Sequence, residues 1–349
     1  MSGGIAQLVA IGAQDAHIVG KPEVSFFRSN YKRHTNFAQT VERQVIQGNP
    51  TSGGMSTVRF ERKGDLLSYV YLAPNDGTKA LRYSASDWVN KISKVELLIG
   101  GQVIDDQTST FSQYIAPTIL AQSLTKSKSG FAEATGKFYP LRFSFCENWQ
   151  SALPLISLQY HDVELRITWN TLSSPEKWEC YAHYVYLDTD ERSVLAGTPQ
   201  NMLITQTQRA IASQSRIQEI NFNHPIKLLA TADGNALTIA GDNNKLKLQI
   251  NGTDVTDFKY VDPHFTAIPA YYHTNASKDE GNSGENDKLF LYPFCLDTCK
   301  LQPTGSLNFS RIDSARLVCD TANHEDDIYG VNYNILRIEN GMGGLMYSN

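Results

Sequence analysis

The chain has 349 residues, which suffices for one large domain or two domains of ordinary size. Hydrophobic residues make up 41% of it and charged residues 19%, so it can bury sizeable cores. The formal net charge is −5 and no long run of Lys and Arg occurs, which argues against direct binding of nucleic acid, because phosphate binding requires clustered positive charge.

The first 24 residues predict an arm outside any sandwich core. Segment 3–21 is too apolar to hang free in solvent and too irregular for a core strand. It lacks a basic start and its apolar run is short, so we expect neither a signal peptide nor a membrane span. Four aromatic side chains after it are expected to anchor the first strand: Phe26, Phe27, Tyr31 and Phe37.

Short apolar or alternating segments bounded by Gly, Pro, Asn or Asp follow along the chain and predict β-strands. Helical segments are expected only at Ser86–Asn90, which Ser86 could cap, and at Ser109–Ser123. Many short strands separated by turns are typical of a sandwich or barrel. The clearest predicted strands are Leu66–Leu72, Val95–Ile99, Val163–Trp169, Tyr181–Leu187, Leu246–Ile250 and Tyr333–Ile338.

A long-period internal repeat organises these strands. Val95–Asp106 reads as strand, Gly-containing turn and strand, and Leu246–Phe258 has the same layout around Asn251–Gly252, a dipeptide typical of a type I′ turn. An aromatic-Pro strand follows each hairpin: Pro140 lies 39 residues after Gly101, and Pro293 lies 41 residues after Gly252. We therefore expect an N-terminal arm (1–24) and two similar sandwiches (25–195 and 196–349), the second ending in a tail.

The histidines and cysteines show no pattern of a catalytic or metal site. The eight histidines occur singly, without the H-x-H pair that a cupin-type metalloenzyme requires, and His161 suits a hydrogen-bonded structural role. The five cysteines form neither a disulfide framework nor a zinc pattern, so reduced and mostly buried thiols are expected. They are Cys146, Cys180, Cys295, Cys299 and Cys319.

The acidic residues suggest one alternative. Asp188, Asp190 and Glu191 alternate as calcium ligands do, but they lack the Gly of a calcium loop. Strand-end carboxylates that pair with Arg192 explain the cluster as well. Nucleophile elbows, Walker loops and dinucleotide fingerprints are absent from the sequence. We predict no enzyme, no cofactor and no metal.

Three N-x-S/T sequons occur, at Asn251, Asn275 and Asn308. Asn251 and Asn275 are candidate glycosylation sites, and Asn275 opens the polar, Gly-rich loop 275–287, which we expect to be exposed. Asn308 lies beside a predicted strand and is expected to be buried and without sugar.

Long stretches at both ends and in the middle of the chain resemble the major capsid proteins of nucleocytoplasmic large DNA viruses, especially those of algal viruses. They are Gly3–Ala38, Ala152–Leu165, Tyr186–Arg192, Asn221–Lys227, Gly305–Leu317 and Tyr333–Asn349. The resemblance implies an all-β fold of two tandem eight-stranded antiparallel jelly-roll sandwiches with short helical insertions. Many family members are considerably longer, so the outer loops of this chain should be short.

The resemblance also implies a function. Three copies would form a pseudo-hexagonal capsomer, and such capsomers would tile an icosahedral shell around an internal membrane, in a virion assembled in the host cytoplasm. Expected partners are other copies, neighbouring capsomers, minor capsid proteins and the membrane side of the shell, with no direct binding to nucleic acid. Candidate contacts are Ile5, Leu8, Val9 and Ile11 in the arm, and Met342, Leu345 and Met346 in the tail.

Two alternatives remain open at this point. A minor or paralogous double jelly-roll capsid protein would share the same fold. A carbohydrate-binding β-sandwich module would be a monomer or small oligomer with aromatic residues at its loop tips, whereas the apolar segments at both ends of this chain favour assembly.

Overall fold

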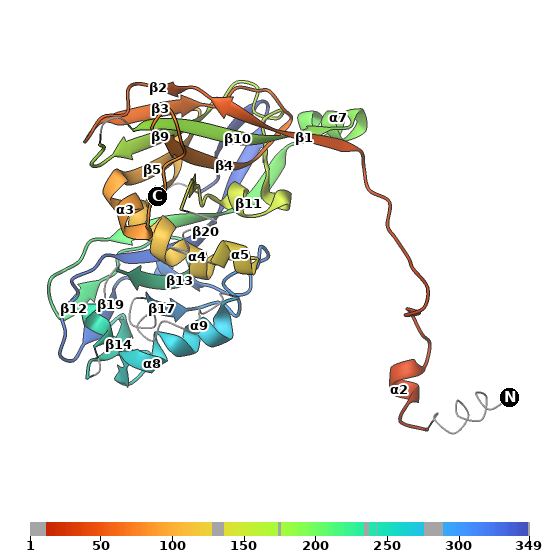
Figure 1. Ribbon diagram of the computed structural model, residues 1–349. Coiled ribbons are helices and arrows are strands. Elements are labelled where there is room, and N and C mark those ends of the chain that lie inside the picture. The colour runs from red at the N-terminus through yellow and green to blue at the C-terminus, as the bar shows by residue number, and fades with distance from the viewer. Residues whose placement is uncertain are drawn as a thin grey trace. The chain divides into compact units, whose positions relative to one another are not determined.

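A computed structural model describes residues 12–127, 136–173, 176–233, 237–241, 243–275 and 289–347. The chain divides into an N-terminal segment, Met1–Asn36, and a compact body, Phe37–Asn349 (Figure 1). The described part of the N-terminal segment holds one short helix, α2 (Ala16–Val19), and its residues are largely exposed. Among the described helices, none is both long and apolar enough to cross a lipid bilayer.

The described residues of the first half of the body form ten strands. They are β1 (Phe37–Gln44), β2 (Ile46–Gln47), β3 (Met55–Arg59), β4 (Leu66–Asn75), β5 (Ile92–Ile99), β6 (Gln102–Thr108), β7 (Tyr139–Pro140), β8 (Leu153–Pro154), β9 (Val163–Trp169) and β10 (Lys177–Leu187). One antiparallel sheet has the order β1-β10-β4-β7, with β8 beside β4, and the other has the order β2-β3-β9-β5-β6.

The second half contains a corresponding set. Its strands are β11 (Gln200–Ala210), β12 (Ile217–Glu219), β13 (Pro225–Ala232), β14 (Lys245–Ile250), β15 (Thr253–Asp254), β16 (Lys259–Tyr260), β17 (Leu289–Pro293), β18 (Leu307–Asn308), β19 (Ala315–Cys319), β20 (Ile328–Glu339) and β21 (Met342–Leu345). One sheet has the order β11-β20-β13-β17 and the other β12-β19-β14-β15, with β16, β18 and β21 at their sides.

The two halves share one topology. In chain order, the first, eighth, third and sixth main strands form one sheet and the second, seventh, fourth and fifth form the other, which is the jelly-roll arrangement. The prediction of two tandem antiparallel jelly rolls is therefore confirmed, with a few short strands added beside the eight main ones. All six clearest strand predictions are also confirmed, Val163–Trp169 at its predicted bounds and the others with ends moved by a few residues.

The predicted hairpin repeat occupies equivalent places. β5 and β6 pair across Gly100 and Gly101, whose φ angles are 58° and 82°. β14 and β15 pair across Asn251 and Gly252, with φ angles of 49° and 78°. Positive φ at both central positions is what a type I′ turn requires, and Gly and Asn tolerate it at little cost.

Short helices and turns connect the strands. They are α3 (Ala85–Lys91), the π-helical turn η1 (Phe111–Ile115), α4 (Ala116–Ile119), α5 (Leu124–Ser127), α6 (Ser144–Glu147), α7 (Thr189–Gly197), α8 (Val261–His264), α9 (Ala267–His273) and the 3₁₀ turns η2 (Trp149–Ser151), η3 (Thr238–Ala240) and η5 (Phe309–Arg311). Both predicted helical stretches are confirmed. The cap is Ser84 rather than Ser86, because Ser84 Oγ accepts from Asp87 N at 3.2 Å while Asp87 Oδ2 accepts from Ser84 N at 3.1 Å.

The acidic segment after β10 caps a helix. Asp188 is the N-cap of α7, and its Oδ1 accepts a hydrogen bond from Thr189 N at 2.8 Å. Arg192, expected to pair with this cluster, has its Nε 3.0 Å from Asp65 Oδ1. Asp190 and Glu191 lie in the first helical turn, where carboxylates are favoured by the helix dipole.

Each jelly roll has an apolar core, and the core of the first also takes in Ile204, Leu336 and Ile338 from β11 and β20 of the second half. Large aromatic side chains dominate the first, where the rings of Trp169 and Trp178 lie 4.8 Å apart and those of Trp88 and Trp178 lie 6.0 Å apart. The second is built around Phe290, Leu246 and other aliphatic and aromatic residues. All five cysteines are buried with free thiols. Each large apolar side chain buried in this way stabilises the fold by about 1.5–3 kcal/mol.

Candidate assembly surfaces

The two jelly rolls are joined by a third apolar cluster. Phe111, Ile115 and Ile119, on η1 and α4 of the first half, are buried against the sheet of β13, β17 and β20 in the second half. Figure 1 shows α4 between the two halves of the body. On β13, the neighbouring Leu229 points to the core of its own sandwich, so the surface that η1 and α4 cover is the outer face of this sheet.

Polar contacts also cross this junction. The hydroxyls of Thr108 and Tyr329 lie 2.7 Å apart, and Asp105 Oδ1 accepts a hydrogen bond from Thr207 N at 2.8 Å. Gln107 Nε2 donates to Asp105 Oδ2 at 2.9 Å. Burial raises the pKa of Asp105 to about 8, so this carboxyl is largely protonated at neutral pH.

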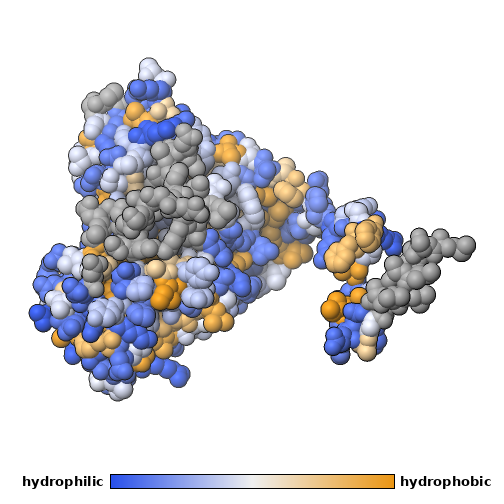
Figure 2. Space-filling view, turned by 60° about the horizontal axis from the view of Figure 1, so that its bottom comes forward, coloured by the Kyte–Doolittle hydropathy of each residue, from blue (hydrophilic) through white to orange (hydrophobic). Residues whose placement is uncertain are grey.

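The outer face of the sheet β1-β10-β4-β7 is aromatic, and the described residues leave it partly exposed. On β4 and β10, the alternation that points Leu72 and Cys180 into the core points Tyr71 and Tyr181 outward, with their rings stacked 5.4 Å apart. Tyr69 stacks on His183 at 4.4 Å in the same way. Figure 2 shows hydrophobic residues, in orange, that interrupt the hydrophilic surface of the body in several places.

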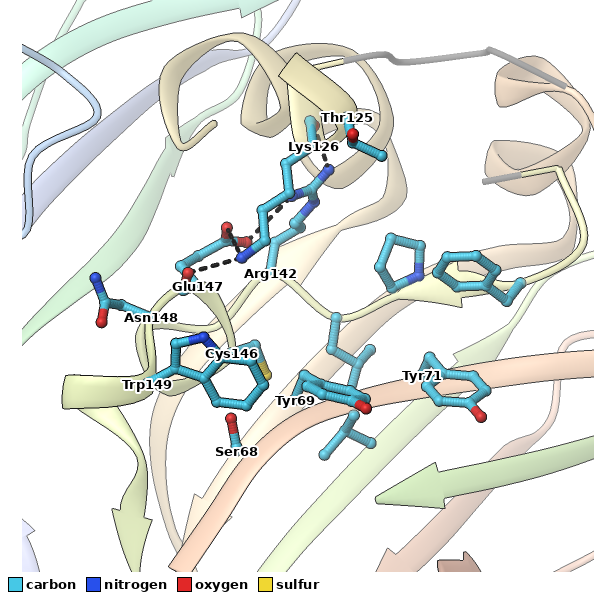
Figure 3. A pocket seen from close by; sticks show the side chains of 14 residues that line it. Ser68, Tyr69, Tyr71, Thr125, Lys126, Arg142, Cys146, Glu147, Asn148 and Trp149 are labelled. Carbon is cyan, nitrogen blue, oxygen red and sulfur yellow. Dashed lines mark hydrogen bonds and ion pairs between the residues drawn. The ribbon is translucent and has the colours of Figure 1, made fainter. Parts of the chain in front are cut away.

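A pocket of about 550 Å³ opens on this aromatic face (Figure 3). Tyr69, Tyr71 and Trp149 lie at one side of it, and a charged group lies at the other, where Arg142 Nη1 is 3.3 Å from Glu147 Oε1 and Lys126 Nζ donates to Glu147 O at 2.7 Å. The pocket is therefore an apolar hollow with two cations that share one carboxylate at its edge.

The pocket does not carry an activated nucleophile. Its one thiol, Cys146, is buried, and burial raises its pKa far above the usual range, so it stays protonated and unreactive. Within the described residues, no three or more His, Cys, Asp or Glu side chains come together in a way that could hold a metal ion. His161 has the structural contact expected for it, with Nδ1 2.8 Å from Gly343 O.

The predicted arm and tail contacts fall in different places. Ile5, Leu8, Val9 and Ile11 lie outside the described residues. The tail forms β21, which pairs with β20, and there Leu345 packs against the core of the first jelly roll while Met342 and Met346 are about half exposed. These side chains therefore have places in or on the folded body.

The prediction that the aromatic residues after the arm anchor the first strand is wrong. Phe26, Phe27 and Tyr31 precede β1 and are almost fully exposed, and Phe37, the first residue of β1, is half exposed.

The sequon asparagines are all exposed. Asn275 and Asn251 lie at the surface as expected, although most of the loop 275–287 lies outside the described residues. Asn251 Oδ1 also accepts hydrogen bonds from Asp313 N and Ser314 N, at 3.0 and 3.1 Å. The expectation that Asn308 is buried is wrong, since it is exposed at the end of β18.

Sequence reasoning missed the open aromatic face and the junction helix as functional surfaces. A signal for the face was present, because Tyr69 and Tyr71 alternate with core residues along β4, and Tyr181 does so along β10. Tyrosine on the outer side of a sheet suits a contact surface, because its ring is apolar and its hydroxyl tolerates water.

Two tandem jelly rolls that share a buried helical junction, and that leave an aromatic sheet face open, define a structural protein of the double jelly-roll class. Residues 25–188 match the family described as "Major capsid protein N-terminus", and residues 191–344 match "Large eukaryotic DNA virus major capsid protein". The chain belongs to this family of major capsid proteins. Its relatives are structural proteins, which confirms that it is not an enzyme and replaces the carbohydrate-binding alternative.

Individual relatives cover the whole chain. It is 33% identical to the major capsid protein of Pyramimonas orientalis virus and 30% identical to that of Paramecium bursaria Chlorella virus 1, with 100% of both proteins covered in each comparison. The quasi-atomic structure of the PBCV-1 virus capsid matches with a TM-score of 0.75 at 25% identity, over 93% of this chain and 100% of that chain. The Faustovirus major capsid protein, at 10% identity and a TM-score of 0.60 over 94% of each chain, shares the fold.

Proposed function

We propose that this chain trimerises into pseudo-hexagonal capsomers that tile the icosahedral shell of a virion. The observation that carries the proposal is the aromatic outer face of the sheet β1-β10-β4-β7, where the described residues leave Tyr71 and Tyr181 partly exposed beside an apolar pocket. Exposed apolar patches of this kind mark association sites. Each chain also contains two jelly rolls of the same topology in one compact body, so three copies would supply the six similar modules of a pseudo-hexagonal capsomer.

The remaining expectations belong to the same proposal. The boundary between the jelly rolls falls at residues 195 and 196, inside α7, and the arm of residues 1–24 together with the tail residues Met342 and Met346 contacts the capsomer base or a neighbouring copy. Minor capsid proteins and the internal membrane adjoin the inner side of the shell. The site of assembly is the host cytoplasm.

Size-exclusion chromatography with light scattering tests the trimer. We expect a stable species of about three times 38.9 kDa, because obligate interfaces commonly bury more than about 2,000 Å². A strict monomer at high protein concentration contradicts the proposal. Protein abundance in purified particles then separates a major capsid protein from a minor paralogue, since only the former dominates the particle mass.

A further inference from the structure

The chain covers one of its two equivalent sheet faces with its own helical segment. In the second jelly roll, Leu228, Leu291 and Val331 on the outer face are buried under the segment η1–α4, which lies between β6 and β7 of the first jelly roll. The contact is apolar, since Phe111, Ile115 and Ile119 on the helical side are also buried. It shows how this fold joins one jelly roll to the next.

Strand register identifies the equivalent face in the first jelly roll. Pro140 of β7 is paired with Tyr71 of β4, and Pro293 of β17 is paired with Leu228 of β13. Tyr71 therefore corresponds to Leu228. On the next strand, Tyr181 pairs with Tyr71 as Val331 pairs with Leu228. The face that is buried in the second jelly roll thus corresponds to the open aromatic face of the first.

A second helical segment, α9, precedes β17 in the second jelly roll as α4 precedes β7 in the first. Pro117 of α4 precedes the strand proline Pro140 by 23 residues, and Pro269 of α9 precedes Pro293 by 24. Matching these prolines places Ile268, Tyr271 and Tyr272 at the positions of Ala116, Ile119 and Leu120.

These three side chains form an exposed stripe on α9. Ile268, Tyr271 and Tyr272 are 38%, 77% and 72% exposed, whereas Ala116 and Ile119 are buried in the junction. They are spaced i, i+3 and i+4, which puts them on one side of the helix. Tyrosine is also the residue type most often found at the centres of protein interfaces, together with Trp and Arg.

We propose that α9 of one copy packs on the outer face of the sheet β1-β10-β4-β7 of the next copy, with Ile268, Tyr271 and Tyr272 against Tyr71, Phe138 and Tyr181. This inference rests on the proposed function and names the surfaces that assemble. In this contact α9 would cover the sheet face of a neighbouring chain, as η1–α4 covers the equivalent sheet face within one chain. The contact is head-to-tail, and such an interface produces a closed ring when the rotation between copies closes.

The pocket beside this face suits the incoming helix. It is lined by Tyr69, Tyr71, Phe138 and Pro140, and its volume of about 550 Å³ exceeds that of a tyrosine side chain. At the edge of the face, Arg43 Nη1 lies 3.5 Å from Glu179 Oε1, so these two charges are paired with each other beside the aromatic centre.

Two single variants, each damaging one side of the contact, test the proposal. We expect Tyr272→Glu on the helix and Tyr181→Glu on the sheet each to lower the mass by light scattering from about three chains to one. Ile211→Glu is the matched control, because Ile211 is 70% exposed and lies on neither surface, and it should keep the wild-type mass. Far-UV circular dichroism checks that each variant is folded.

Mixing the two variants distinguishes a head-to-tail contact from a symmetric one. The Tyr272→Glu chain keeps an intact sheet face and the Tyr181→Glu chain keeps an intact helix, so one productive contact remains between them. We expect a dimer that contains one chain of each kind. A mixture that stays monomeric overturns the proposed pairing of these two surfaces.

Thiol protection provides a readout that does not depend on disrupting the assembly. All five native cysteines are buried, so a cysteine introduced at the surface is the main thiol open to a maleimide. When these cysteine variants form the same oligomer as the wild type, the thiols of Tyr272→Cys and Tyr181→Cys should react with maleimide at least tenfold more slowly than the thiol of Ile211→Cys. If the wild-type chain is monomeric, both the proposed function and this inference fail. If it trimerises while the two Glu variants trimerise equally well and both thiols react rapidly, only this inference fails.

Discussion

The carboxyl group of Asp105 accepts a hydrogen bond from the backbone N–H of Thr207 at 2.8 Å, and this bond joins β6 of the first jelly roll to β11 of the second. Both residues are buried at the junction. The bond therefore satisfies a backbone donor that the packing of the two halves removes from water, and a donor left without an acceptor there would cost about 1–3 kcal/mol.

The pKa of Asp105 makes the junction sensitive to pH. Burial raises this pKa to about 8, whereas an unfolded Asp titrates near 3.9. The folded chain therefore holds a proton that the unfolded chain has lost between about pH 4 and 8, so the stability contributed by this group is complete below pH 4 and is lost as pH rises to 8.

The Asp105→Asn variant should flatten this dependence, because the amide oxygen can still accept from Thr207 and does not titrate. Urea unfolding at pH 5 and pH 8 measures the change, which should be a few kcal/mol in the wild type and smaller in the variant. As a comparison, Asp105→Ala should be destabilised at both pH values by about 1–3 kcal/mol. An unchanged pH slope in Asp105→Asn would show that Asp105 is not its source.

Phe111 should couple the unfolding of the two halves. Its side chain is 1% exposed, and its ring centroid lies 5.7 Å from that of Tyr329 in the other jelly roll. We expect Phe111→Ala to lower the free energy of unfolding by about 3–5 kcal/mol, because it leaves a cavity in the junction.

The four tryptophans allow this coupling to be measured, since all of them lie in the first half of the chain, at positions 88, 149, 169 and 178. Tryptophan fluorescence reports the first jelly roll and far-UV circular dichroism reports both. The two transitions should coincide in the wild type and separate in Phe111→Ala. Phe26→Ala, in an exposed position, should change the stability of the unassembled chain by less than about 0.5 kcal/mol.

Gly343 should be required for the tail to pack. A Cβ atom there would lie 2.6 Å from Leu158 Cδ2 and 3.2 Å from Ile99 Cγ2, both in the first jelly roll. Because both neighbours are fully buried core residues, Gly343→Ala should cost about 1–3 kcal/mol through overpacking.

Gly197 offers a matched control for this substitution. It is the last residue of α7, and a Cβ atom there would meet nothing within 4 Å. Gly197→Ala should be neutral or slightly stabilising in a thermal unfolding scan. Equal melting temperatures for the two alanine variants would contradict the close packing of the tail.

His324 should destabilise the second jelly roll in acid. Burial lowers its pKa to about 4, and its Nε2 lies 3.4 Å from Cys319 Sγ. An unfolded His titrates near 6.5, so between about pH 6.5 and 4 the unfolded chain binds a proton that the folded chain does not bind. The free energy of unfolding therefore falls by up to about 3 kcal/mol as the pH drops over this range.

The His324→Gln variant should lose this acid-dependent part of the unfolding free energy, measured by chemical denaturation at pH 7 and pH 4.5. Substituting the exposed His264 in the same way should leave the profile as in the wild type. Identical profiles for His324→Gln and the wild type would count against the assignment.

Local chemistry was sufficient to predict most of the secondary structure. Period-two alternation predicted β9 at its observed bounds, and Asn251–Gly252 predicted the β14–β15 turn. Local reasoning placed a helix cap at Ser86 when it is Ser84, because both serines precede the helix and only their backbone geometry separates them. The prediction that Phe26 and Phe27 anchor the first strand is wrong, because the apolar character of a side chain does not specify which part of the protein covers it.

The sequence pattern by itself determined two tandem β-sandwiches, because strand alternation, turn residues and the hairpin repeat are properties of neighbouring residues, whereas the jelly-roll topology was implied by the family resemblance. Only the tertiary structure decided which sheet faces are covered. Tyr71 and Leu228 hold equivalent outward positions on equivalent strands, yet η1–α4 buries the face around Leu228 and leaves the face around Tyr71 open. The buried contact joins residues more than a hundred positions apart, and no local pattern specifies which apolar face a distant helix will reach.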